Sequence, residues 1–166
     1  MNSSPIIALA WTIDDPVRLE LALSKCSQGL EIRGTLGDTL LTASISAGHF
    51  KNANFLIDHE ISLDTTNDLS IGAIGSLVLY LQNNHTDTNM SDGIELLQKL
   101  ISKGADVNTT NSVRTPVVLI AQNTPGLEEI AKILLDAGAD PNFKPVYKDP
   151  YEHLYGQQVV LPEFKV

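Results

Sequence analysis

Histidine and cysteine side chains are the first candidates for catalysis or metal binding, and this chain has few of them. It contains His49, His59, His85 and His153, and one cysteine, Cys26. No two histidines stand four residues apart, as two metal ligands on one helix face would. A single cysteine can form neither an intramolecular disulfide nor a thiolate cluster. We expect Cys26 to be an unreactive thiol and His59 to end a helix, where a cationic side chain suits the helix dipole.

Paired acids and glycines offer no better constellation. The pairs at 14–15 and 128–129 each stand where we expect a helix to begin, and carboxylates at that end interact favourably with the helix dipole. The stretch GAIGS, residues 72–76, lacks the lysine of a phosphate-binding loop. The sequence therefore predicts a protein that is not an enzyme and that uses no cofactor and no metal ion.

The charge balance narrows the kinds of partner. There are 20 acidic and 11 basic residues, which give a net charge of −9, and the acids form no run. Because no basic stripe is present, we expect no nucleic-acid binding; an acidic surface instead suits solubility or a basic partner protein. The N-terminus does not resemble a secretory signal, and no apolar run approaches the roughly 20 residues that span a bilayer. We expect no membrane contact and a cytoplasmic location, with the nucleus open as well.

An internal repeat is the most specific feature of the chain. The pentapeptide GADVN at 104–108 returns as GADPN at 138–142. Each copy follows a segment with apolar residues at helical spacing, 91–103 and 124–137. Glycine after a helix permits the left-handed conformation that ends it, and the acid can hydrogen-bond the turning backbone. The recurrence predicts that the chain turns the same corner twice.

Helix starts are indicated by residues that cap or open a helix. Ser91 or Asp92 can cap the segment that leads to the first GAD. Thr124, followed by a proline at the first helical position, can cap the segment that leads to the second. Thr115 can cap a shorter helix over 114–122 in the same way.

Helices are expected to occur in pairs along the whole chain. The remaining predicted helices lie at 4–11, 14–25, 40–46, 50–59 and 70–82. A tight turn at 47–49 separates the two central ones. A helix pair cannot bury its apolar face alone, so neighbouring pairs must stack.

At this point the sequence resembles the ankyrin repeat family. Gly37, Thr39, Leu41, Gly48 and His49 match the opening and the inter-helix turn of that repeat, and the two pentapeptides match its close. The resemblance implies an all-α, ankyrin-type solenoid of helical hairpins over residues 1–143. The implied repeats are 3–33, 35–67, 69–108 and 112–143, the first of them an N-terminal cap. It also implies that the turn histidine hydrogen-bonds locally.

Three features depart from the family pattern. Thr42, Gly75 and Val118 replace the histidine whose hydrogen bond tightens each opening turn, so the resemblance does not predict that bond here. Larger residues replace a small pair in the first helices, which predicts irregular stacking. The polar stretch 82–92 makes the third repeat about 11 residues longer than the family frame. It is expected to be a solvated loop or a lengthened first helix; the alternative is a partner-binding insertion.

The last segment, 144–166, is rich in aromatic residues and proline. The exposed end of a solenoid needs a cover, so we expect this tail to pack on the last repeat. The alternatives are a partner-binding segment and disorder.

The resemblance implies a protein–protein interaction module, acting as an adaptor, inhibitor or dedicated chaperone and monomeric on its own. Its partner, another protein, would contact the concave groove formed by the first helices and the loops between helix pairs, which we call the turn fingers. The turn fingers include Leu36 and Leu69. The candidate contact residues carried over from the family are Trp11, Thr12, Thr35, Asp38, Ser46, Asp68, Tyr80, Arg114, Gln122 and Asn123. The alternative function is a structural subunit docked through the tail or an end of the solenoid.

Overall fold

The computed structural model describes residues 5–145, and within them the chain is entirely helical. No strand occurs in this range; two isolated bridges join Arg33 to Thr39 and Thr110 to Pro116. A single turn of 3-10 helix, η1 (Gly29–Glu31), lies in one connection. None of the helices in residues 5–145 is both long and apolar enough to cross a membrane. The α-helices are α1 (Pro5–Thr12), α2 (Pro16–Ser24), α3 (Leu40–Ser46), α4 (Phe50–Asp58), α5 (Ala73–Asn83), α6 (Asp87–Ser102), α7 (Val117–Gln122) and α8 (Glu128–Asp136).

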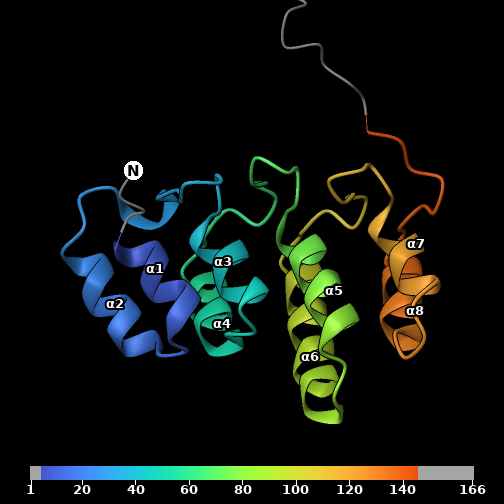
Figure 1. Cartoon of the computed structure of the whole chain (residues 1–166), viewed down its shortest axis with the longest axis horizontal. Coiled ribbons are helices and arrows are strands. Elements are labelled where there is room, and N and C mark those ends of the chain that lie inside the picture. The colour runs from blue at the N-terminus through green and yellow to red at the C-terminus, as the bar shows by residue number, and fades with distance from the viewer. Residues whose placement is uncertain (1–4, 146–166) are drawn as a thin grey trace, which may run out of the picture.

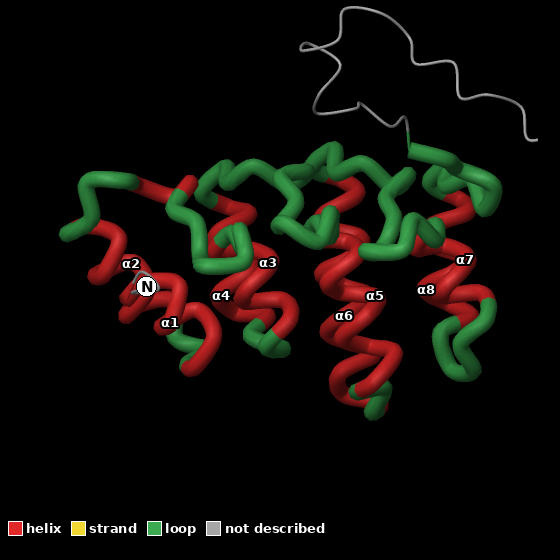
Figure 2. Tube along the Cα trace, turned by 45° about the horizontal axis from the view of Figure 1, so that its top comes forward, coloured by secondary structure: helices red, strands yellow, loops and turns green. Residues whose placement is uncertain are grey.

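The helices form four pairs that stand side by side in a row (Figure 1). In one layer, which we call the inner layer, α1 contacts α3, α3 contacts α5 and α5 contacts α7, and the other four helices form the outer layer. In the other layer α2, α4, α6 and α8 follow one another in the same way. The long loops that join successive pairs gather along one edge of the row (Figure 2). The predicted all-α class is confirmed for the described residues.

The core runs through the row between the two layers and between neighbouring pairs. Each helix contributes at least one fully or almost fully buried apolar side chain, such as Leu19, Ile45, Leu77 and Leu134. At about 25 cal/mol per Å² of buried apolar area, these contacts between pairs dominate the stability of the row.

The corners after α4, α6 and α8 have one geometry. Gly104 and Gly138 follow α6 and α8 with φ of 91° and 95°, as predicted. In each corner the next N–H reaches back to a carbonyl five residues earlier, over 3.0 Å in the first and 2.9 Å in the second. Glu60 takes the same place after α4 with φ of 59°, where a side chain is strained. The corner therefore exists even where the glycine signal is missing.

The openings of α3, α5 and α7 differ in their capping hydrogen bonds. Thr39 caps α3 through its hydroxyl, and the Thr42 hydroxyl accepts from the Thr39 N–H at 2.9 Å. The opening turn therefore has a hydrogen bond at Thr42, where threonine supplies the acceptor in place of histidine. α5 and α7, which carry Gly75 and Val118, have no side-chain cap.

The insertion folds as helix rather than as loop. α6 begins at Asp87 and Thr86 caps it, so the prediction of Ser91 or Asp92 as the cap is wrong. The Thr86 hydroxyl accepts from the Asn89 N–H at 3.3 Å, which lets the helix start earlier. Most of the extra residues lengthen the second helix of the pair, not the first.

The openings of the last pair also differ from prediction. α7 begins after Pro116, and the Thr115 N–H instead donates to the Asn111 side chain at 2.9 Å. α8 begins only at Glu128, because Gly126 has φ of 91°, which no helix residue adopts. Thr124 does not cap it; its hydroxyl donates back to the Ile120 carbonyl at 2.8 Å.

Polar contacts tie the first two pairs together. His49 Nδ1 donates to the Ala10 carbonyl at 2.8 Å, so the expected local hydrogen bond is wrong and the bond joins two pairs. The fully buried Asn52 donates its amide to the Ile13 carbonyl at 2.7 Å and its N–H to Asp14 at 2.9 Å. These bonds fix the position of the first pair against the second.

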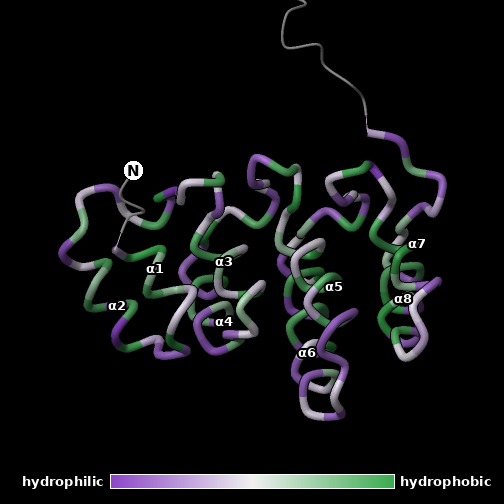
Figure 3. The backbone as a smooth tube through the Cα atoms, viewed as in Figure 1, coloured by the Kyte–Doolittle hydropathy of each residue, from purple (hydrophilic) through white to green (hydrophobic). Residues whose placement is uncertain are grey.

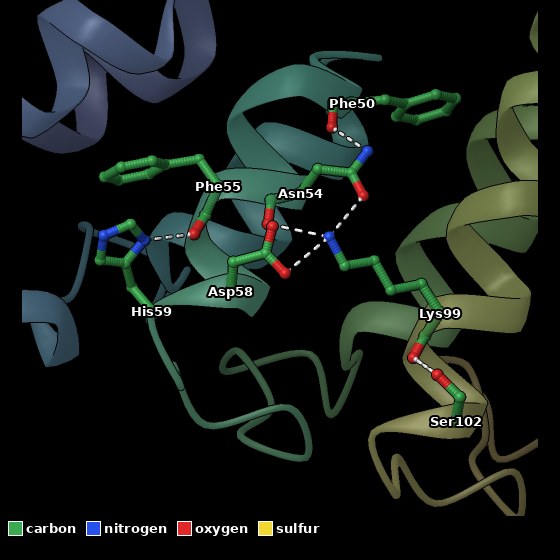
Figure 4. Close-up of polar contacts among 7 residues, drawn as sticks. All are labelled: Phe50, Asn54, Phe55, Asp58, His59, Lys99 and Ser102. Carbon is green, nitrogen blue, oxygen red and sulfur yellow. Dashed lines mark hydrogen bonds and ion pairs between the residues drawn. The ribbon is translucent and has the colours of Figure 1, made fainter.

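A lysine joins the second and third pairs in the outer layer (Figure 4). Lys99 Nζ on α6 lies 2.9 Å from Asp58 Oδ1 on α4. It also donates to the Asn54 side-chain oxygen at 3.0 Å and approaches the Asn54 carbonyl at 3.3 Å. Beside it, His59 ends α4 as expected, and its Nδ1 donates to the Phe55 carbonyl at 2.8 Å.

Candidate functional site

The three loops between helix pairs share one hydrogen-bonded shape. In each, the first residue donates its N–H to the carbonyl of the fifth: Gly34 to Asp38, Asn67 to Ile71 and Asn111 to Thr115, over 2.8 to 3.0 Å. Because each loop closes on itself, the loops are pre-formed rather than loose connections.

The fourth residue of each loop is in the left-handed region. Gly37, Ser70 and Arg114 have φ of 71°, 62° and 63°. The side-chain oxygens of Asn67 and Asn111 accept two backbone N–H groups each within their own loops, which holds this conformation. Only the first loop has the glycine that the conformation favours.

An apolar side chain stands exposed at the third position of every loop. Leu36, Leu69 and Val113 are 59%, 50% and 74% exposed. We call this set the apolar tips. Leu36 and Leu69 were among the predicted finger residues, whereas Val113 was missed. Val113 holds the same position in its loop as the two leucines hold in theirs, and this equivalence could have identified it.

The first two loops are bound to each other. Asp68 N–H donates to the Leu36 carbonyl at 3.0 Å, and the Asn67 amide donates to Asp38 Oδ1 at 3.0 Å. A side chain at Gly37 would collide with Asp68, since its Cβ would lie 2.3 Å from that carboxylate. Asp38 is therefore partly used within the protein, while the other predicted acid, Asp68, stays exposed.

Below these loops the inner layer carries an open cavity of about 230 Å³ between α3 and α5. It brings together two of the predicted contact residues, Ser46 and Tyr80. Ser76 also lines it; this residue is 3% exposed, and its hydroxyl has no hydrogen-bond partner among the described residues. A buried hydroxyl without a partner is costly. The remaining lining residues are Asn67, Ile71, Leu79, Asn83 and Asn84.

Tyr80 has a fixed orientation in this cavity. Its ring meets Phe50 edge-on, with ring centres 5.5 Å apart and planes at 75°. Its hydroxyl lies against Gly48, where an added Cβ would be 2.4 Å away. Tyr80 is thus part of the wall as well as a candidate contact.

The other predicted contact residues lie at the ends of inner-layer helices. Trp11, 41% exposed, and Thr12 end α1, but α3 separates them from Tyr80 on α5. Gln122 ends α7, and the next residue, Asn123, donates its amide to the Leu119 carbonyl at 2.9 Å. The inner layer therefore places these residues along one edge, at opposite ends of the row.

The last two predicted contacts, Thr35 and Arg114, are exposed residues of the first and third loops. They flank the apolar tips Leu36 and Val113. All three loops thus present polar and apolar side chains together.

The described residues contain no group of histidine, cysteine, aspartate and glutamate able to hold a metal ion. The pKa values of two exposed side chains on α8 differ from their ordinary values. Backbone N–H groups of Glu128 and Gly126 hold the pKa of the Glu128 carboxyl below its ordinary value. A hydrogen bond to Asp136 raises the pKa of Lys132. Both groups lie on α8, in the outer layer, away from the cavity.

No protein-family model matches the chain, and a search of curated proteins returned no match. The candidate site therefore rests on the loops, the apolar tips and the cavity themselves.

Proposed function

We propose that this chain is an ankyrin-type solenoid of four helical hairpins that binds another protein and catalyses no reaction. The partner would lie against the apolar tips and in the cavity between α3 and α5, which Asn67 and Ile71 of the second loop help to line. The observation that carries the proposal is the exposure of an apolar side chain at the same position of three pre-formed loops.

The register of the repeats supports the ankyrin-type arrangement. Gly37 and Ser70, which hold the same place in their loops, stand 33 residues apart, the length of the family repeat. The third loop follows later because of the insertion. Helix pairs stacked through a shared core are the other hallmark of such solenoids.

The energetics favour binding at the tips. Covering a half-exposed leucine or valine yields about 1 kcal/mol by the usual area relation. Three such residues on closed loops gain this with little ordering cost, since their backbone is already fixed. Because the chain carries a net charge of −9, a basic partner would be attracted to this surface. We propose a monomer in the cytoplasm, with no binding of nucleic acid.

A second candidate is a structural subunit docked through an end of the row. α2 is the outer helix at the N-terminal end, and it exposes Val17 by 73% and Leu21 by 57%, one helical turn apart. A terminal repeat of a soluble solenoid ordinarily presents a polar outer face. The predicted tail lies almost wholly outside the described residues, so its role in docking stays a prediction.

Affinity purification with mass spectrometry separates the two candidates. One variant replaces the three apolar tips by serine, and a matched variant carries Val17→Ser and Leu21→Ser. Circular dichroism checks that each variant keeps its helix content. Binding through the loop edge predicts that a partner captured by the parent chain is lost in the tip variant and kept in the end variant.

The opposite pattern would favour the structural-subunit function, as would loss of the partner on deletion of residues 146–166. A third variant, Trp11→Ala with Tyr80→Phe, tests the groove anchors. The Tyr80→Phe change keeps the ring contact with Phe50 and removes only the hydroxyl, so folding is preserved. Unchanged capture by both the tip variant and this one would refute the proposal.

A further inference from the structure

The long helix of the third pair extends beyond its neighbour. α6 has 16 residues and α8 has 9. Gly104 and Gly138 take the same place after α6 and α8. When the two helices are aligned on these glycines, Glu128 at the start of α8 corresponds to Ile94 of α6. The earlier turns of α6, residues 87–93, therefore have no counterpart on α8. The α5–α6 hairpin visibly projects past the other pairs (Figure 1), and its far end is largely hydrophilic (Figure 3).

An open cavity of about 500 Å³ lies where α6 passes the start of α8. Its floor is apolar, since Met90 and Ile94 are half-buried neighbours one turn apart. Its rim is acidic and exposed: Asp87 and Glu95 on α6, and Glu129 on α8. With Ser91 these residues make up the wall, and we call this surface the α6 overhang.

The overhang is held in place by contacts between the insertion and the turn before α8. Gln82 donates its amide to the Thr124 hydroxyl at 3.3 Å. The His85 ring packs on Gly126, where an added Cβ would lie 3.4 Å from the ring. The insertion is thus anchored to the fourth pair, so the cavity between α6 and α8 is a defined surface.

The charges that face the overhang are only partly compensated, by the attraction between Lys132 and Glu129. Lys99 on α6 is bound to Asp58, and Lys132 on α8 is bound to Asp136 at 2.8 Å. The carboxylates of Asp87, Glu95 and Glu129 surround an apolar floor in a protein that is acidic as a whole. An occupant must therefore supply both positive charge and apolar side chains.

We propose that the α6 overhang is a second docking surface, which receives a basic amphipathic helical segment of a partner protein. Apolar side chains of that segment cover Met90 and Ile94, and its lysines or arginines pair with the three carboxylates. Helices that lay an apolar face into a groove are a common mode of recognition. The surface belongs to the outer layer, so this inference is independent of the loop edge in the inner layer.

The test uses a short helical peptide of leucine and lysine as the probe, with the full chain labelled for NMR. We expect shift changes at residues 87–95 and 128–133. The double variant Glu95→Gln with Glu129→Gln should weaken binding about fivefold or more, as expected for two exposed ion pairs. The control Glu20→Gln with Glu60→Gln removes the same charge from exposed positions outside the overhang and should change affinity by less than about twofold.

The apolar part is tested separately. Met90→Ser should weaken the peptide several-fold, whereas Leu21→Ser, at the far end of the row, should not. A peptide with serine in place of leucine keeps the charge and should bind weakly to every variant. Absence of binding, equal weakening by both charge variants, or shift changes confined to the loop edge near Tyr80 would each overturn the proposal. The last result would leave the proposed function intact.

Discussion

Glu60 occupies a corner that holds glycine after α6 and α8, and replacing it by glycine should stabilise the protein. Its φ is 59°, and its hydrogen bonds match those at Gly104: Glu60 N–H to the Ile57 carbonyl and Ile61 N–H to the Leu56 carbonyl, both 3.2 Å. A residue with a Cβ costs about 1–2 kcal/mol in the left-handed region. Glycine loses about 0.5–1 kcal/mol more backbone entropy on folding than alanine does.

The net gain expected for Glu60→Gly is about 0.5–1 kcal/mol, or about 1–4 °C in the melting temperature of a chain this size. Urea unfolding followed by circular dichroism measures it. Glu60→Gln removes the charge and keeps the strain, so it should change stability by less than about 0.5 kcal/mol. The converse change, Gly104→Ala, should destabilise by about 1 kcal/mol. If Glu60→Gly were no more stable than Glu60→Gln, the left-handed corner after α4 would be refuted.

Three further predictions concern contacts between and within the helix pairs. Lys99→Met removes the ion pair with Asp58 and the contacts to Asn54, and should lower the free energy of unfolding by about 1–2 kcal/mol in urea titrations. The control Lys132→Met removes an exposed ion pair within α8 and should lower it by under about 0.5 kcal/mol. Asn52→Ala leaves a carbonyl of the first pair without its donor and should cost about 1–2 kcal/mol, with faster amide exchange in α1 and α2 as the second readout. Glu128 has a lowered folded-state pKa, so its contribution is present above pH 4.5 and is lost as pH falls through the folded value; Glu128→Gln should therefore flatten the acid limb of the stability profile.

The helix pairs and their corners could be predicted because they depend on local rules. Gly104 and Gly138 end helices for a conformational reason that any sequence shares. The amphipathic pattern of α6 and α8 identifies which residues are buried, since Leu97 and Leu134 face the core as their spacing requires. The corner at Glu60 has the same shape without glycine, and the carbonyls of Ile57 and Leu56 accept the N–H groups of Glu60 and Ile61 there.

The helix starts were harder to predict because several residues competed for the same role. Thr124 precedes a proline, as a helix cap often does, but its hydroxyl donates to the Ile120 carbonyl of the preceding helix. Thr86 caps α6 from within a stretch so polar that a loop was a reasonable expectation. The resemblance places His49 in a turn, which predicts a local hydrogen bond for its ring. The carbonyl that the ring reaches instead belongs to Ala10.

The candidate site was predictable in outline only. Ser46 and Tyr80 share the cavity because both lie at the same end of inner-layer helices. Exposure, however, depends on neighbouring loops: Asp38 is engaged by Asn67, which sequence spacing does not reveal. Val113 was not predicted because its exposure follows from the register of the third loop, which the bond from Asn111 to Thr115 fixes.

Photo-crosslinking at two matched glutamines tests the central claim most directly. Gln122 lies on the inner layer and Gln98 on the outer helix α6, and both are exposed. A photoreactive amino acid is placed at one or the other position in the full chain, with folding checked by circular dichroism. Binding through the inner layer predicts that the partner found by affinity purification is captured from position 122 and not from position 98. Capture of that partner from position 98 alone would contradict it.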